Sequence, residues 1–407
     1  MIAIKTFFKT HTLFSIYSVV FIILLNGVIE TSGSKYVFNM FLFFIPLMIF
    51  YFGFTYFAKK KKFKAFSYLK NIPNLLPDYS YLILTGICVF LVIGHLIHIG
   101  GSPGAKGLSV MDTKGIVELR RNITSEASSL WNYLSSFNIK AILPFSLLLL
   151  AFKKKKILFG ILITIGAFYA FSLMQKSYIL TVLFPIILLS LFYKKYLQST
   201  GLFLICGIVI ISLVYIQNPQ MRGGVDNVTK IEIPLEDRVD SDYPYFIRVL
   251  LGLKHRILVV PGEMVAKWFQ EIPKSKPFLY ENGYGFICKI KGIKHVEYSK
   301  VLYPIIRPKY AEKGLKGSVN TASFMYEYSN FGNTGLVLSA LFLGFLLFFV
   351  ESIFGNNMLL KTSLNLFPIF MLSSGALTTA LFSGGWGLII ILYYIFTREF
   401  SLESEKK

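Results

Sequence analysis

Long runs of apolar residues alternate with short basic clusters along most of the chain. Each run is long enough for one transmembrane helix, because about 20 apolar residues cross the hydrocarbon core of a bilayer. The last apolar region, 364–396, has room for two spans that turn near Ser383, Gly384 and Gly385. The pattern predicts about ten transmembrane helices. Before the last region, the predicted spans are 13–29, 37–58, 79–99, 137–152, 157–174, 178–193, 201–216 and 335–354.

Basic clusters predict the orientation of these helices. Lys59–Lys62 follow the second span, Lys153–Lys156 follow the fourth, and Lys194 and Lys195 follow the sixth, while Lys361 occupies a short loop after the eighth. Cytoplasmic loops of membrane proteins carry an excess of lysine and arginine. All of these clusters fall on one side of the predicted membrane, so both termini are predicted to be cytoplasmic.

Composition agrees with an all-α polytopic integral membrane protein. Hydrophobic residues make up 54% of the 407 residues, charged residues only 15%, and the mean hydropathy is +0.60. The formal net charge of +21 comes from lysine blocks beside apolar runs, which favours anionic lipid over nucleic acid as the partner. We predict helices 1–7 with an outer loop at 100–136 in residues 1–216, an extracytoplasmic domain at 217–334, and helices 8–10 with a cytoplasmic tail at 335–407.

The predicted extracytoplasmic interval contains an amphipathic pattern near its centre. A set of apolar residues between 246 and 260 recurs at spacings of three and four, which predicts a helix with one apolar stripe. Such a helix lies on a membrane and presents its cations to a ligand; alternatively, it caps the bundle with a solvated basic face. The apolar stripe consists of Phe246, Val249, Leu250, Leu253, Ile257 and Val260, and the other face consists of Arg248, Gly252, His255 and Arg256.

Further cations are predicted on the outer face. Arg120 and Arg121 lie in the first outer loop, Lys176 in a tight hairpin, and Arg222 in the long interval. The guanidinium fork pairs with phosphate at two points, so clustered arginines suggest a phosphorylated lipid ligand. The alternative is that the arginines form ion pairs with nearby carboxylates. The remaining cations of the interval are Arg238, Arg248, Lys254, Arg256 and Arg307, and the nearby carboxylates are Asp237, Asp240 and Asp242.

Aromatic residues and two histidines leave further alternatives open. The aromatics of the interval, Tyr284 and Tyr328 among them, suit either an interfacial belt or a platform for sugars. His95 and His98 share one helical face, but no third metal ligand accompanies them, so no metal is expected. Interfacial hydrogen bonding is one role for the pair, and the base of a membrane O-acyltransferase is another.

One string links the interval to a known family. The residues GSVNTASFMYEYSNFGNTGLVLSALFLG resemble the Wzy family of O-antigen and capsule repeat-unit polymerases, in which an aromatic, FG and a second glycine enter a glycine-bearing span. The strings WFQEIP and NGYGF, and the hairpin SLMQKSYIL with Lys176, are similar to other parts of that family. The residues that match the first pattern are Tyr328, Phe331, Gly332, Gly335 and Gly344.

The resemblance implies a glycosyltransferase that polymerises undecaprenyl-pyrophosphate-linked oligosaccharides at the outer face of the plasma membrane, without a cofactor. Cations would stabilise the pyrophosphate leaving group, and a base would accept the proton of the acceptor hydroxyl. Arg248 and Arg256 are assigned the first role. The candidate bases are His255, Glu263 and Glu327, and the substrate-binding candidates are Arg120, Arg121, Lys176, Arg222, Tyr284 and Tyr328.

Other functions fit the same topology. An O-antigen ligase would deliver the lipid-linked glycan to lipid A core instead. A polysaccharide exporter is expected to have polar or broken helices within the membrane, whereas charged side chains are almost absent from the interiors of the predicted spans. A chain-length regulator and a flippase are the expected protein partners of a polymerase.

Overall fold

A computed structural model describes residues 7–60, 79–125, 127–219, 245–312, 314, 317–355 and 357–401. Within these ranges every regular element is a helix and no β-strand occurs. The prediction of an all-α fold is therefore confirmed for the described part of the chain.

In the same ranges, 7 helices are long and apolar enough to cross a membrane, and three further apolar helices are shorter. These lengths and compositions are those of a polytopic membrane protein. The long helices are α2 (Thr12–Ser32), α3 (Val37–Lys60), α5 (Ser80–His98), the continuous helix Ser129–Phe152, α12 (Tyr196–Gln217), α20 (Asn333–Phe354) and the stretch Leu377–Phe396. The shorter ones are α10 (Lys156–Ser172), α11 (Lys176–Phe192) and α21 (Met358–Met371).

The chain divides into two compact units. Unit 1 contains Met1–Phe63, Ile231–Ser352 and Ile369–Ala380, and unit 2 contains Lys64–Lys230, Ile353–Pro368 and Leu381–Lys407. The two units are defined by contacts within the fold, whereas the predicted division at residues 217 and 335 is defined by membrane topology. The units therefore do not test the predicted division.

In unit 1, the predicted amphipathic helix is two helices, α13 (Tyr245–Leu258) and α14 (Val260–Glu271). The predicted single stripe through Val260 is therefore interrupted at Val259. The reason is Pro261 in the first turn of α14, because proline has no backbone N–H and favours a helix start.

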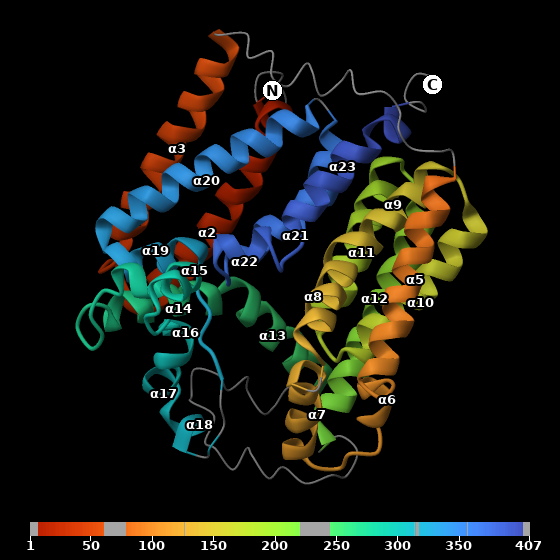
Figure 1. Cartoon of the computed structure of the whole chain (residues 1–407), viewed down its shortest axis with the longest axis horizontal. Coiled ribbons are helices and arrows are strands. Elements are labelled where there is room, and N and C mark those ends of the chain that lie inside the picture. Colours follow the sequence, from red (N-terminus) through yellow and green to blue (C-terminus); the bar gives the residue numbers. More distant parts are fainter. Residues whose placement is uncertain are drawn as a thin grey trace. The chain divides into compact units, whose positions relative to one another are not determined.

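Helix α14 packs directly along α2 (Figure 1). The two backbones meet at a pair of glycines: a Cβ atom added to Gly262 would lie 2.2 Å from the Leu24 carbonyl oxygen and 2.7 Å from the Gly27 Cα. A Cβ atom added to Gly27 would lie 2.3 Å from the Val259 carbonyl oxygen. Glycine at both positions thus permits backbone contact between the interval and the first membrane helix.

The rest of the interval in unit 1 consists of short elements. They are a 3₁₀ turn (Tyr280–Gly283), α15 (Gly285–Lys291), α16 (Tyr298–Val301), α17 (Tyr303–Ile306), α18 (Pro308–Glu312) and α19 (Ser323–Phe331). One residue, Gly332, separates α19 from the long apolar helix α20. Short helices therefore lead the chain from α14 to the start of a membrane-spanning candidate.

Helices α3 and α20 complete unit 1 together with α2. The rings of Phe43 on α3 and Phe324 on α19 stack with their centroids 4.3 Å apart. Near the end of α20, the buried Glu351 carboxylate accepts hydrogen bonds from the backbone N–H groups of Thr12 and Leu13 at 2.9 and 3.0 Å. Thr12 and Leu13 begin α2, and a carboxylate at the start of a helix satisfies otherwise unpaired N–H donors and complements the helix dipole.

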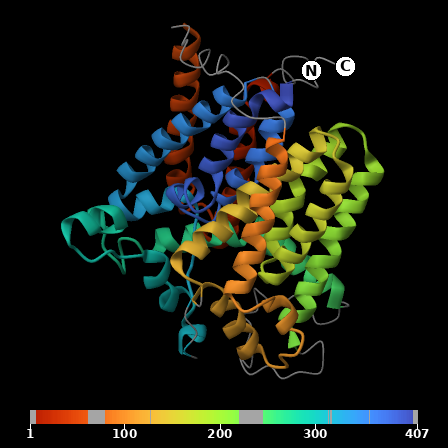
Figure 2. The ribbon, with the colours of Figure 1, turned by 45° about the vertical axis from the view of Figure 1, so that its right-hand side comes forward.

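Unit 2 contains a series of antiparallel helices, α9 (Leu143–Phe152), α10, α11 and α12 (Figure 2). Turns of equal length join them, at residues 153–155, 173–175 and 193–195. The central residue of each turn, Lys154, Met174 or Lys194, has a φ angle of 54° or 55°. A left-handed residue after a helix closes it and reverses the chain. Lys176 is consequently the first residue of α11, and lies just after the turn in which it was predicted.

The fourth predicted span begins earlier than residue 137. Helix α8 (Ser129–Phe137), a π-helical segment (Asn138–Ile142) and α9 form one continuous helix. The predicted outer loop 100–136 therefore holds α6 (Pro103–Lys106), α7 (Thr113–Ser125) and all of α8 except its last residue. Polar residues such as Asn132 and Ser135 at the start of this helix hid it from the apolar pattern.

The C-terminal boundaries also differ from the prediction. A turn does include Gly385, whose φ is 80°, but the helices around it are α22 (Leu377–Leu381) and α23 (Trp386–Ser401), and α21 precedes them. Lys361 was predicted in a loop and instead lies buried within α21. Within α21 the polar side chain of Asn365 has partners: it donates to the Lys361 carbonyl oxygen at 2.8 Å and accepts from the Trp386 indole at 2.7 Å.

Candidate functional site

The predicted site residues are distributed over both units. Unit 2 holds Arg120, Arg121 and Lys176, which were predicted on the outer face, whereas Arg222 lies outside the described residues. Unit 1 holds the residues with predicted catalytic roles and both tyrosines. These are Arg248, His255, Arg256, Glu263, Tyr284, Glu327 and Tyr328.

Helix α13 carries the predicted leaving-group cations. Arg256 and Lys254 are exposed, and His255 is partly buried. Arg248 belongs to the same helix, and its side chain lies outside the described part of the structure. The described cations of α13 are thus accessible to an anionic ligand.

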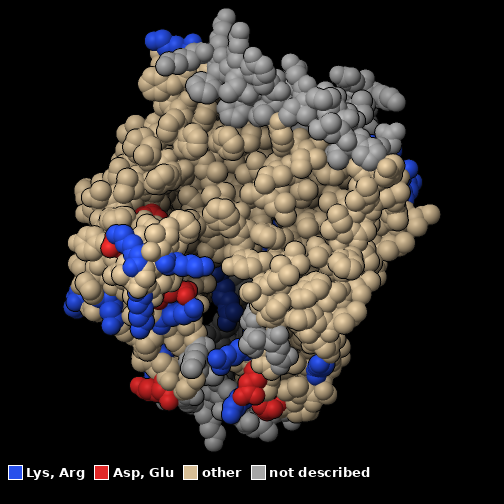
Figure 3. Space-filling view, in the orientation of Figure 1, with Lys and Arg blue, Asp and Glu red and all other residues tan. Residues whose placement is uncertain are grey.

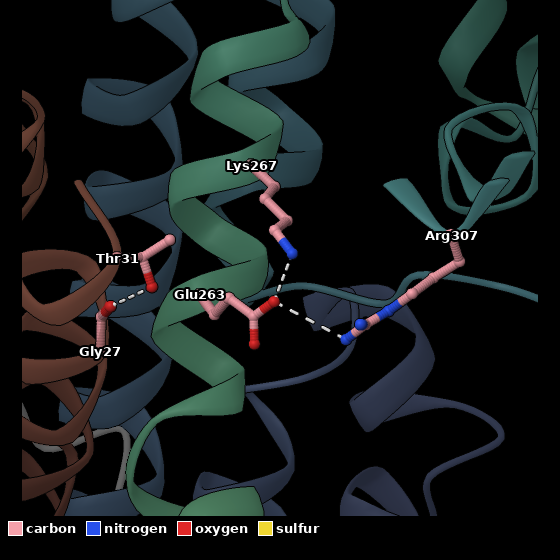
Figure 4. A network of polar contacts seen from close by, with 5 residues as sticks. All are labelled: Gly27, Thr31, Glu263, Lys267 and Arg307. Carbon is pink, nitrogen blue, oxygen red and sulfur yellow. Dashed lines mark hydrogen bonds and ion pairs between the residues drawn. The ribbon is translucent and has the colours of Figure 1, made fainter. Parts of the chain in front are cut away.

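Glu263 on α14 connects two cations. Its carboxylate pairs with Lys267 one helical turn later, and its Oε1 atom lies 3.7 Å from a guanidinium nitrogen of Arg307. Figure 4 shows Glu263 pointing away from Gly27 and Thr31 of α2 and toward these cations. The Glu263 side chain is 13% exposed, and the two cations about a quarter. We name these residues the Glu263 cluster.

Local packing explains the position of this cluster. Glu263 directly follows Gly262, so the contact between α14 and α2 fixes the first turn of α14. Arg307, far away in sequence, directly follows α17. The spacing of Glu263 and Lys267 is typical of a helical ion pair and was visible in the sequence. Lys267 was nevertheless missed. The alternative ion-pair partners of the arginines, Asp237, Asp240 and Asp242, lie outside the described residues.

Glu327 on α19 forms a second cluster with Tyr284 and Asn330. The Tyr284 hydroxyl donates a hydrogen bond to the Glu327 carboxylate. Burial raises the pKa of Glu327 above its ordinary value, and hydrogen bonds from Tyr284 and Asn330 offset part of this effect. Burial also raises the pKa of Tyr284, as does the neighbouring Glu327. We name these residues the Glu327 cluster.

Asn330 in this cluster is buried and has one unused acceptor. Within the described part of the chain, its Oδ1 atom has no hydrogen-bond partner. Gly283 allows the close approach of this side chain, because a Cβ atom there would lie 1.9 Å from Oδ1. Buried polar atoms normally have partners, so the free acceptor is suited to a ligand that donates a hydrogen bond.

Tyr328, predicted to bind substrate, is buried between α14 and α19. Its hydroxyl donates to the Ile272 carbonyl oxygen at 3.1 Å, and its ring lies edge-on to Phe269 with centroids 4.7 Å apart. The Trp268 indole donates to the Val319 carbonyl oxygen at 3.1 Å. These contacts make the aromatic residues part of the core that joins α14 to α19, and substrate binding by Tyr328 stays a prediction.

Lysine and arginine side chains gather over the short helices α14–α18, as Figure 3 shows, while mostly other residue types cover the long helices in that view. The positive charge of this surface comes mostly from exposed lysines. In sequence order, the basic residues of 260–312 are Lys267, Lys274, Lys276, Lys289, Lys291, Lys294, Lys300, Arg307 and Lys309. This surface would attract anionic ligands and lipids.

In unit 2, the two histidines of α5 have separate partners. The buried His95 Nδ1 lies 3.0 Å from the Tyr169 hydroxyl, and His98 Nε2 accepts a hydrogen bond from the Ser128 N–H at 3.1 Å. Among the described residues, no three His, Cys, Asp or Glu side chains lie together in a way that could hold a metal ion. Each histidine thus makes one hydrogen-bonding contact through a ring nitrogen, and the role of a base stays a prediction.

The three predicted substrate-binding cations of unit 2 lie on helices. Arg120 and Arg121 are exposed on α7, and the partly buried Lys176 begins α11. A cation at the start of a helix is unfavourable for the helix dipole.

Comparison with known proteins gives no relative: no family model, no curated protein and no solved structure matches the chain.

Proposed function

We propose that the protein is a membrane glycosyltransferase that polymerises polyprenyl-pyrophosphate-linked oligosaccharide units at the outer face of the plasma membrane. The resemblance of residues 317–344 to repeat-unit polymerases supports this function. The observation that carries it is the Glu327 cluster, because this string contributes a carboxylate of raised pKa beside an unpaired, buried acceptor. Both groups suit recognition of a sugar hydroxyl.

In the proposed reaction, a hydroxyl oxygen of the acceptor sugar forms a bond to the anomeric carbon of the donor. The bond between that carbon and the pyrophosphate oxygen breaks, and the lipid pyrophosphate leaves with the electron pair. Glu327 accepts the hydroxyl proton, while Asn330 Oδ1 accepts a hydrogen bond from a neighbouring hydroxyl. General bases of this kind contribute about 10²–10⁴-fold to the rate.

Glu327 suits the role of base better than the other candidates. Glu263 already contacts Lys267 and Arg307, which suits a positioning role for these cations. His255 lies beside Arg256 on α13, where it suits contact with the leaving group. The cations Arg256, Arg307 and Lys267, with Arg248, would stabilise the charge that develops on pyrophosphate. Arg120, Arg121, Lys176 and Arg222 are proposed to hold the lipid carriers, and Tyr284 and Tyr328 to shape the sugar site.

The proposed topology has ten spans with both termini in the cytoplasm. The long and the shorter apolar helices together supply these spans, and α10 and α11, at 17 residues each, extend about 25 Å. In this topology the basic turns at 153–155 and 193–195 are cytoplasmic, and the turn at 173–175 is external. The segment 217–334 is then external and contains both clusters.

The proposal is tested by deletion of the gene and gel analysis of surface polysaccharide. A deletion strain that attaches only a single repeat unit to its acceptor, and regains the ladder on complementation, supports a polymerase. Lipid-linked polymer that accumulates unattached would indicate a ligase and contradict the proposal. Complementation with Glu327→Gln is expected to leave a single repeat unit, whereas Glu281→Gln, an exposed carboxylate of the same segment paired with Lys291, should restore the ladder.

A further inference from the structure

Helix α15 exposes apolar side chains in an unusual pattern. Phe286 and Ile290 lie four residues apart on the same side and are 77% and 70% exposed, whereas Cys288 on the other side is buried. Ile293, just after the helix, is also exposed. Large apolar side chains that neighbour one another in this way favour burial against a partner.

Helix α15 is joined to the rest of unit 1 through the turn that precedes it. It follows the 3₁₀ turn Tyr280–Gly283, which packs against α19. The Cys288 thiol lies 3.5 Å from the carbonyl oxygens of Glu281 and Asn282, and Gly292 ends the helix with a φ of 67°. The exposure of Phe286 and Ile290 is therefore a feature of an ordered element.

Helix α15 lies at the end of the candidate spans of unit 1. Through the 3₁₀ turn it contacts α19, which precedes α20 by a single residue. The start of α20 lies beside the start of α3, because Asn39 donates to the Asn333 side chain at 3.1 Å. Phe38 and Phe342 on these two helices are exposed and suit contact with lipid tails. In Figures 1 and 2, α17 and α18 lie farther from this end than α15 does.

Positive charge surrounds the exposed apolar residues. Lys289, Lys291 and Lys294 are exposed, and of these Lys291 pairs with Glu281. Apolar side chains flanked by lysines are typical of helices that lie in the interface of a membrane, where lysines meet anionic headgroups. The short helix and its position beside two spans favour lipid over a separate protein partner.

We propose that α15 is an interfacial anchor. Phe286 and Ile290 enter the boundary between headgroups and acyl chains of the leaflet at which α3 and α20 begin, and Lys289 and Lys294 bind anionic headgroups. The anchor would hold the segment 280–331, and with it the Glu327 cluster, at a fixed depth. It follows from exposure and charge and does not depend on the proposed function.

The test places a nitroxide spin label on the full-length protein in nanodiscs of phosphatidylcholine and phosphatidylglycerol. The label is attached to Phe286→Cys, after the buried Cys88, Cys206 and Cys288 are replaced by alanine. We expect the label to collide more with oxygen, which concentrates in lipid, than with a water-soluble nickel chelate. The matched control is a label at Lys309→Cys, an exposed position on α18, which should show the opposite preference.

Equal nickel access at Phe286 and Lys309 would overturn the proposal by placing α15 in water. Low access of both reagents to Phe286 would also overturn it, because another segment or a second copy of the chain would then cover the helix. The charge component is tested with Lys289→Gln/Lys294→Gln. This change should reduce the depth of the label in nanodiscs with phosphatidylglycerol but leave the depth unchanged in phosphatidylcholine alone. If the change alters the depth in neither lipid, binding to anionic headgroups is refuted.

Discussion

The contact of α14 with α2 is tested by Gly262→Ala. The new Cβ atom would lie 2.2 Å from the Leu24 carbonyl oxygen and 2.7 Å from Gly27 Cα, whereas ordinary van der Waals contact begins at 3.4 Å. Both opposing atoms belong to backbone, so no side chain can rotate away. The helices must separate by about 1 Å, and overpacking of this kind costs about 1–3 kcal/mol.

The assay is thermal unfolding of the purified protein in detergent, with Gly252→Ala as the matched control. Gly252 lies on α13 in the same unit and has nothing within 4 Å of its added Cβ atom. Alanine is the better helix former, so this variant should be as stable as the parent or slightly more stable. Gly262→Ala is expected to lower the Tm by several degrees.

Gly27→Ala extends the experiment to the other side of the same contact. Its Cβ atom would lie 2.3 Å from the Val259 carbonyl oxygen, so it should destabilise the protein to a similar degree. The double variant should lose less than the sum of the two, since one separation of the helices relieves both clashes. Equal Tm values for Gly262→Ala and Gly252→Ala would refute the packing of α14 on α2.

Other predictions concern the two clusters and the helix ends. Because the pKa of Glu327 is raised by burial, a reaction that uses it as base should lose rate on acidification at a higher pH than an ordinary glutamate would cause. Tyr284→Phe removes a hydrogen bond that favours the carboxylate, so the acidic limb of the pH–rate profile should move further upward; an unmoved limb would argue against Glu327 as base. Arg256→Ala should abolish polymer on polysaccharide gels, whereas Lys254→Ala should retain it. Immunoblots and topology reporters should show an unchanged protein level and topology. A normal ladder in Arg256→Ala would remove this arginine from the mechanism. Glu351→Ala should destabilise the protein by about 0.5–2 kcal/mol through loss of the cap on α2, measured by unfolding, and an unchanged stability would contradict that cap.

The helices of the membrane region were predictable where apolar residues are continuous. The spans 79–99 and 335–354 differ from α5 and α20 by no more than two residues at either end. Prediction failed where polar residues occur within a helix. The buried Lys361 of α21 resembles a loop residue in sequence, because burial of a lysine depends on partners that the sequence pattern does not reveal.

The candidate site was only partly predictable. Periodicity placed Arg256 and His255 on one helix. The break at Val259 could have been predicted only from Pro261, which marks the start of a new helix. Glu263 pairs with Arg307, and Tyr284 with Glu327, across 44 and 43 positions of the chain. Such long-range contacts have no periodic signature. The exposed pair Phe286 and Ile290 was likewise hidden, because their exposure depends on which side of α15 meets the protein.

Glycosyl transfer itself is tested most directly with purified protein in nanodiscs and a lipid-linked repeat unit isolated from a strain that lacks the gene. The account predicts a ladder of lipid-linked products with release of polyprenyl pyrophosphate, and loss of both in Glu327→Gln. If folded, correctly inserted protein leaves the substrate unchanged, the central claim is contradicted. If Glu327→Gln is as active as the parent, the proposed base is contradicted.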